Sequence, residues 1–240
     1  MERKKFIKTL SLFAFSGTAI FNSCQKSSGN SLEEEMEEVV LDGSCTVTPS
    51  ETAGPFPTKT PASYIRSDIR KGDNIGVDMM ALLTIQNVNA NCAGLKGAVV
   101  DIWHCDVDGN YSQYGGTQMQ QNNLQEVNWY RGRQISDVNG LVKFQTIFPG
   151  WYQGRSTHIH VHIYDETGKS LLITQIAFQD SLSMEVNRNG SKYGYKKGVS
   201  GYTTNSRDGI FSDGVSKEMS VITGSLEEGF ELKINLKVKA

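Results

Sequence analysis

The stretch GWYQGRSTHIHVHIY, residues 150–164, decides how this chain is expected to fold. Its second half alternates histidine with aliphatic residues, and side chains two apart in a β-strand point to the same face. His158, His160 and His162 would therefore line one face, while the aliphatic residues between them line the other. The whole chain has four histidines, and three of them stand here. The pattern predicts a strand with a metal site on one face and core residues on the other.

Strand-like runs recur on both sides of this segment, separated by turn signals such as Pro149-Gly150. Many short strands without a long amphipathic helical pattern predict an all-β fold, an antiparallel β-sandwich with long irregular loops. Asp137–Gly140 is expected to close a hairpin, and Ser181–Arg207 is expected to be irregular. The expected strands are Ala81–Val88, Ala98–Cys105, Arg133–Ser136, Leu141–Phe148, His158–Tyr164, Leu171–Phe178 and Phe230–Val238.

The first 44 residues do not fit this pattern. A basic start, RKKFIK, precedes a mostly apolar run, which predicts an export signal over residues 1–23. The run is too short to span a membrane. Cys24, directly after it, resembles a bacterial lipoprotein acceptor. We therefore expect an exported protein whose only membrane contact is a lipid anchor at Cys24, in the periplasm or at the cell surface. A plain secretory leader is the alternative.

Residues 24–44 contain the acidic run EEEMEE and are expected to form a flexible linker, which leaves residues 45–240 as one domain. The net charge of −2 provides no basic stripe, so nucleic acid is not an expected partner. An exported domain permits disulfides, and we predict a Cys45–Cys92 bridge with Cys105 buried as a small hydrophobe. The oligomeric state is not determined by the sequence, and a homo-oligomer is left open.

The candidate metal ligands include tyrosines as well as histidines. Tyr152 stands six residues before His158, and Tyr111 follows an Asp-Gly-Asn turn. A phenol has a pKa of about 10 and ligates strongly only as phenolate, so its partner must be a hard, highly charged cation. Two phenolates and one hydroxide balance the charge of Fe(III), and a neutral site is easier to bury than a charged one. The sequence therefore predicts Fe(III) as the cofactor, in preference to zinc.

Three runs, read together, carry a family pattern. They are ETAGPFP (51–57), VVDIWHCDVDGNYS (99–112) and RGRQISDVNGLVKFQTIFPGWYQGRSTHIHVHIY (131–164), with a weaker tail at DGIF (208–211). Together they resemble the intradiol ring-cleavage dioxygenases, which include catechol 1,2-dioxygenase and protocatechuate 3,4-dioxygenase. The resemblance implies the β-sandwich of that family. It also implies non-haem Fe(III)-dependent cleavage of a catechol-type aromatic diol by O2 to a muconate-type diacid.

The resemblance also implies a role for each matching residue. Tyr111 would be a retained equatorial phenolate ligand, and Tyr152 the axial phenolate that the substrate displaces. His158 would be the equatorial imidazole ligand, and His160 the axial one. A ferric tyrosinate of this kind is expected to give the visible charge-transfer colour of the family.

Four further residues surround these ligands in the pattern. Arg155 matches an arginine beside the substrate that stabilises negative charge on the ring. Gln175 matches a family glutamine just outside the ligand set. His162 has no ligand position in the family and is expected to be a polar neighbour. His104, in the WHCD run, is expected to be structural.

Two other classes of protein compete with this interpretation. Gly154, His160, His162 and Glu166 fit the first half of a cupin metal signature, although the following glycine is replaced by Ile173 and no second motif exists. A non-catalytic exported β-sandwich that binds carbohydrate or protein is the other alternative, with surface aromatics at Tyr193, Tyr195 and Tyr202.

The substrate itself is left open. Arg131 and Arg133 are candidates for binding a substrate carboxylate, as protocatechuate would require. Phe56 stands where protocatechuate enzymes carry a hydroxylated aromatic residue, which argues against that substrate.

Overall fold

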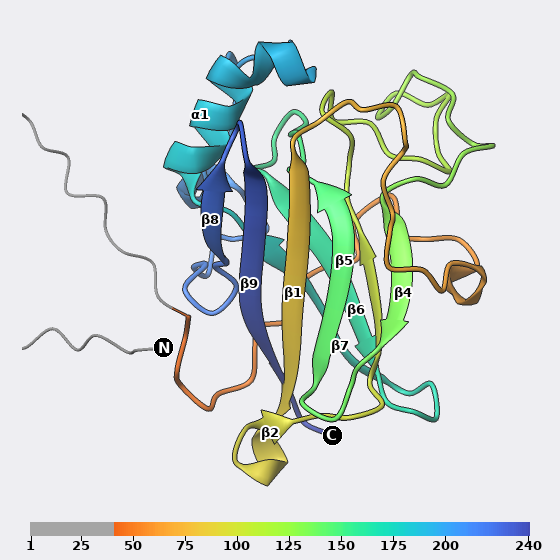
Figure 1. Cartoon of the computed structure of the whole chain (residues 1–240), viewed down its shortest axis with the longest axis vertical. Coiled ribbons are helices and arrows are strands. Elements are labelled where there is room, and N and C mark those ends of the chain that lie inside the picture. The colour runs from red at the N-terminus through yellow and green to blue at the C-terminus, as the bar shows by residue number, and fades with distance from the viewer. Residues whose placement is uncertain (1–40) are drawn as a thin grey trace, which may run out of the picture. The chain divides into compact units, whose positions relative to one another are not determined.

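The computed structural model describes residues 41–240, and they form two β-sheets packed face to face (Figure 1). The predicted export signal, Cys24 and most of the predicted linker lie outside the described residues. The first sheet has the order β4 (Arg131–Ile135), β3 (Val99–Trp103), β6 (His158–Tyr164), β7 (Ser170–Ala177). The second has the order β2 (Ala93–Gly94), β1 (Asp78–Asn87), β9 (Gly229–Val238), β8 (Val221–Ser225), and β5 (Leu141–Ile147) also pairs with β1. The predicted β-sandwich is confirmed.

Two pairings differ from the expectation. Strands β1 and β9 run parallel, whereas the other ladders are antiparallel. The turn at Asp137–Gly140 forms, with the Gly140 amide donating to the Asp137 carbonyl at 3.0 Å. The strands on either side of it do not pair, because β4 pairs with β3 and β5 pairs with β1. The predicted hairpin is wrong: this turn carries the chain from one sheet to the other.

The alternation in β6 places its two faces as predicted. Ile159, Val161 and Ile163 are fully buried in the core between the sheets. His158 and His160 lie on the outer face of the first sheet and are buried by loops rather than by the second sheet. Burial of each aliphatic side chain contributes about 1.5–3 kcal/mol, so the core fixes which face the histidines occupy.

The stretch expected to be irregular contains a helix. Helix α1 spans Asp180–Asn189 and continues into the 3-10 helix η3 at Gly190–Tyr193. Its sequence is mostly polar and buries only Ser183, Val186 and Asn187, so it has no apolar stripe that the sequence could reveal. Within residues 41–240 no helix is long and apolar enough to cross a membrane. Short 3-10 helices complete the fold: η1 (Pro61–Ser63), η2 (Val88–Ala90) and η4 (Asn205–Arg207).

The segment from residue 41 to residue 59, called the strap below, is fastened to both sheets. The predicted Cys45–Cys92 disulfide is present, and Cys105 is a buried free cysteine. Asp42 pairs with the buried ammonium of Lys237 in β9 at 2.6 Å. Further along, the Glu51 amide donates to Ile173 of β7 at 2.8 Å. These contacts direct the rest of the strap across the outer face that carries the histidines.

Candidate active site

His160, one of the two buried histidines of β6, is enclosed by Trp103 and by the strap. Trp103 of β3, the register partner of His160, stacks on its imidazole with centroids 5.0 Å apart and planes 2° apart. The strap covers the other side at Gly54, whose φ of +69° favours glycine. A Cβ at this position would lie 2.9 Å from Cε1 of His160. The strap therefore packs so closely against the imidazole that a side chain at position 54 would require a shift.

Three of the four predicted ligands converge. The His158 Nε2 atom lies 3.1 Å from His160 Nε2, and the Tyr111 hydroxyl lies 3.3 Å and 3.2 Å from these two nitrogens. Donors that share one metal at about 2.1 Å, in octahedral or tetrahedral directions, stand roughly 3–3.4 Å apart. These three atoms, called the triangle below, are therefore spaced like the ligands of one metal ion. In the described part of the chain no group of three or more His, Cys, Asp or Glu side chains forms a metal site, which leaves this mixed His/Tyr set as the candidate.

The protonation of these groups suits a cation. Burial lowers the pKa of His158 to about 3 and that of His160 well below its usual value, so both imidazoles are neutral. His158 Nδ1 lies 2.7 Å from the Ser156 carbonyl and donates to it, which leaves a lone pair on Nε2. His160 Nδ1 has no partner among the described residues. Burial also raises the pKa of Tyr111 well above 10, so its phenolate requires a nearby positive charge.

Tyr152 lies beside this triangle and contacts Arg155. Its ring faces His158 at 5.6 Å and Tyr111 at 5.8 Å between centroids. Its hydroxyl accepts from Arg155 Nη1 at 3.3 Å, and the same Nη1 lies 3.4 Å from His158 Nε2. Tyr152 is half-buried, whereas Tyr111 is fully buried. The fourth predicted ligand is therefore the most accessible of the set.

Arg155 is held by two partners on its other side. Its Nε donates to both carboxylate oxygens of Asp208 at 2.9 Å, and its Nη2 donates to Gln175 Oε1. The Gln175 amide in turn donates to the Thr52 carbonyl of the strap at 2.8 Å. Asp208 is fully buried and also accepts from the amide and hydroxyl of Ser156. Asp208 was not singled out from the sequence, where only the DGIF tail marks its position.

The two arginines considered for a substrate carboxylate are both engaged elsewhere. Arg131 is fully buried and donates to oxygens of its own chain. Arg133 forms an ion pair with Asp101 of β3 at 2.6 Å. The structure does not support that expectation, because Arg131 uses its donors within the chain and the charge of Arg133 is paired with Asp101.

The remaining histidines lie away from the triangle. His162 Nε2 contacts Ser170 at 2.8 Å, and its Nδ1 contacts Tyr164. His104 is buried, with Nε2 2.6 Å from Thr146. The cupin interpretation is wrong, since it needs His160 and His162 at one ion.

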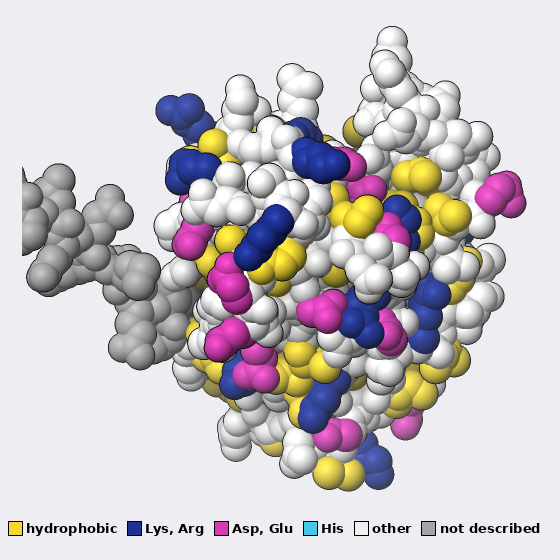
Figure 2. All heavy atoms as spheres, turned by 45° about the horizontal axis from the view of Figure 1, so that its top comes forward, with side chains coloured by type: hydrophobic (Ala, Val, Ile, Leu, Met, Phe, Trp, Pro, Cys, Tyr) yellow, Lys and Arg dark blue, Asp and Glu magenta, His cyan; other side chains and the backbone are white. Residues whose placement is uncertain are grey.

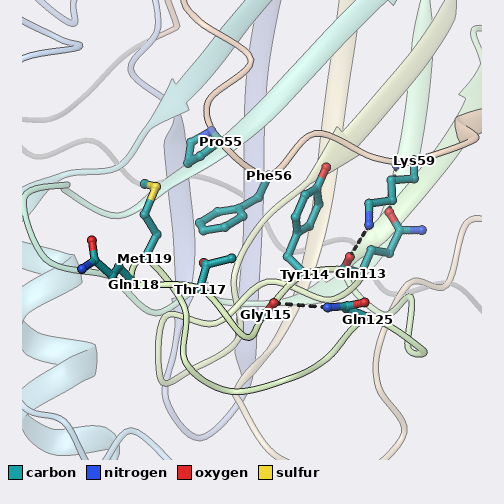
Figure 3. A pocket seen from close by; sticks show the side chains of 10 residues that line it. All are labelled: Pro55, Phe56, Lys59, Gln113, Tyr114, Gly115, Thr117, Gln118, Met119 and Gln125. Atoms are coloured by element: carbon teal, nitrogen blue, oxygen red, sulfur yellow. Dashed lines mark hydrogen bonds between the residues drawn. The ribbon is translucent and has the colours of Figure 1, made fainter.

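A cavity of about 550 Å³ lies next to the site, between the strap and the loop that follows Tyr111 (Figure 3). Phe56 separates it from the ligands: its ring stacks on Tyr111 at 4.9 Å and meets Tyr114 edge-on at 5.2 Å. Lys59 lies over the Tyr114 ring and donates to the Gln113 carbonyl at 2.9 Å. On the face shown in Figure 2, basic and acidic side chains are interspersed.

Known proteins share this fold and pattern. A family model described as dioxygenase matches residues 53–188. The solved structure of an intradiol ring-cleavage dioxygenase from Tetranychus urticae is 32% identical, with a TM-score of 0.71, covering 81% of this chain and 95% of that one. The 3-chlorocatechol 1,2-dioxygenase of Rhodococcus opacus 1CP shares the fold at 18% identity and a TM-score of 0.53, covering 80% of this chain and 72% of that one.

A chlorocatechol 1,2-dioxygenase of Rhodococcus opacus is 31% identical over 35% of this chain, a match that spans 38% of that relative. The chain belongs to the intradiol ring-cleavage dioxygenases. This membership also overturns the interpretation as a non-catalytic binding module.

Proposed function

We propose that this protein cleaves a catechol-type aromatic diol with O2 to a muconate-type diacid, using Fe(III) held by Tyr111, Tyr152, His158 and His160. The proposal depends on the convergence of the Tyr111 hydroxyl with the Nε2 atoms of His158 and His160. When bound there, ferric iron supplies the Lewis acidity that holds the diol as a dianion and makes its ring reactive toward O2.

The side chains around the triangle have different roles in the proposed reaction. Tyr152 is the accessible donor, and its oxygen, once ionised as a ligand, is placed to take a proton from the entering diol. Arg155 lies between Tyr152 and His158, where its guanidinium offsets negative charge on the bound diol. Asp208 and Gln175 fix the Arg155 side chain in that position. Trp103 and the strap exclude water from the imidazoles.

Oxygen uptake tests the proposal. The full chain, loaded with Fe(III), is expected to consume O2 with one of catechol, protocatechuate and hydroxyquinol, and to form a product with muconate-type ultraviolet absorption. His160→Ala should lose iron, whereas Tyr152→Phe should keep iron and slow substrate binding. An iron-loaded wild type that consumes no O2 with any catechol, or full turnover in both variants, would contradict the assignment.

We further propose that the chain is exported and anchored by a lipid on Cys24. The basic-then-apolar start and the position of Cys24 support this proposal, and a Cys45–Cys92 disulfide suits an oxidising compartment. Incorporation of labelled palmitate should occur in the wild type and disappear in Cys24→Ser. Equal labelling in the two proteins, or none in either, would refute the anchor.

A further inference from the structure

The cavity beside the ligands is larger than a simple diol requires. Its volume of about 550 Å³ lies within the range of roughly 300–1,000 Å³ that is typical of sites for drug-sized ligands. Catechol is a single ring, and its two oxygens would be held at the triangle, from which Phe56 separates the cavity. The cavity is therefore available to a second part of a larger substrate.

The cavity lies within reach of a ring bound at the triangle. Tyr152, the ligand that the diol would displace, has its ring 5.8 Å from that of Tyr111, and Phe56 stacks on Tyr111 at 4.9 Å. Tyr152 and Tyr114 both pack against the buried cluster that contains Phe56 and Tyr111. The rings of Tyr111 and Phe56 thus lie between the place of the reacting diol and the cavity. A second aromatic ring can reach the cavity on a short linker that passes them.

The walls of the cavity favour an uncharged aromatic group. Figure 3 shows Met119 and Tyr114 on opposite sides of the Phe56 ring. Met119 is 67% exposed, and its thioether makes favourable contacts with aromatic rings. No carboxylate is among the residues of 41–240 that line this cavity. Lys59 lines it, but its ammonium already donates to the Gln113 carbonyl at 2.9 Å and lies 4.6 Å from the centre of the Tyr114 ring.

The loop that forms one wall is fixed by its own hydrogen bonds. Gln120 is buried, and its Oε1 accepts from the Tyr111 amide at 2.6 Å. Its Nε2 donates to the carbonyls of Tyr111 at 2.8 Å and Tyr114 at 2.9 Å. Gly115 has a φ of +138°, and a Cβ there would overlap the Asn122 carbonyl oxygen. Because these contacts already order the loop, a second ring can bind without that entropic cost.

We propose that this cavity binds a second, uncharged aromatic ring of the substrate, so that the protein acts on catechols joined to another ring by a short linker. The inference rests on the proposed function, because the diol itself must be held at the triangle. Met119 and Tyr114 are the residues that select the second ring, by thioether and ring contacts.

Binding measured without oxygen tests the inference, since no turnover occurs under that condition. The Fe(III)-loaded full chain is dialysed anaerobically against catechol or against 3,4-dihydroxystilbene, which adds a phenyl ring on a two-carbon linker. The stilbene should bind roughly tenfold more tightly than catechol, because its second ring is removed from water in the cavity. In air, the ratio of kcat/KM for the two diols should follow the same order.

Two variants of the loop separate contact with the second ring from general effects on the site. Met119→Ala should lower the preference for the stilbene over catechol about fivefold, since it removes the thioether contact. Gln121→Ala is the matched control, because Gln121 is exposed on the same loop and does not line the cavity. This control should keep the wild-type preference. Both positions are exposed, so neither variant should prevent folding.

Four results would overturn the inference. The first is equal affinity of the wild type for catechol and the stilbene, and the second is an unchanged preference in Met119→Ala. The third is an equal loss of affinity for both diols in that variant, which would make Met119 a structural residue. The fourth is tighter binding of the 4′-carboxylate of the stilbene than of the neutral compound, which would assign the cavity to an anionic group. A wild type that binds neither diol would instead refute the proposed function.

Discussion

Replacement of Asp208 by Asn should uncouple Arg155 from the rest of the site. Asp208 is fully buried, the Arg155 side chain is 11% exposed, and the two are joined at 2.9 Å. The same carboxylate accepts from the Ser156 amide at 2.9 Å and the Ile210 amide at 3.0 Å. Asn replaces one acceptor oxygen by a donor, so at least one of these amides loses its partner while Arg155 loses its counter-charge. Removing one partner of a buried pair costs about 3–5 kcal/mol.

Urea unfolding of the iron-free chain measures that cost. Asp68→Asn is the matched control, because it breaks an exposed pair with Arg70 at 2.8 Å and should cost less than about 1 kcal/mol. In the iron-loaded protein a displaced guanidinium should lower kcat/KM roughly a hundredfold. If the two variants unfold within about 1 kcal/mol of each other, or Asp208→Asn turns over at the wild-type rate, the account of this network is refuted.

Three further perturbations follow from the packing of the domain. Burial raises the pKa of Glu218 to about 8, so the folded protein binds this proton more tightly than the unfolded chain does. The free energy of unfolding should therefore fall by about 4 kcal/mol as the pH rises from about 4.5 to 8. Denaturation measured across this pH range should show the fall in the wild type and not in Glu218→Gln. Double replacement of Cys45 and Cys92 by Ala should cost about 4 kcal/mol in thermal unfolding, given their separation of 47 residues; an unchanged melting temperature would contradict this. Gly54→Ala should lower the free energy of unfolding by about 2 kcal/mol and speed the release of iron, because the new Cβ combines a positive φ with a 2.9 Å approach to His160. Loss of iron to a competing chelator at the wild-type rate would argue against that contact.

The local pattern of the sequence predicts the ligand face and seven of the nine strands, but it misses the short strands β2 and β8. The period-two alternation of β6 places His158 and His160 opposite the core residues, and the PGWY and GNYS runs locate both tyrosines. Such periodicity says which face a side chain occupies but not which strand lies beside it. For that reason the parallel β1–β9 pair was not foreseen, and the Asp137–Gly140 turn was predicted as a hairpin.

The residues that support the ligands depend on distant contacts. Arg155 meets Asp208 across 53 positions, and Arg131 meets Phe56 across 75. Neither pairing has a local signature, and an arginine in a strand is equally compatible with substrate binding, a surface ion pair or a buried clamp. Only the fold shows that Arg133 is paired with Asp101 while Arg131 carries no acidic partner in the described part of the chain.

Resonance Raman and visible absorption of the Fe(III)-loaded full chain test the central claim most directly. The account predicts tyrosinate vibrations enhanced within a visible charge-transfer band, from two distinct phenolates in the wild type and from one each in Tyr111→Phe and Tyr152→Phe. Stoichiometric iron without a tyrosinate signal, or a signal that survives unchanged when both tyrosines are replaced, would contradict it.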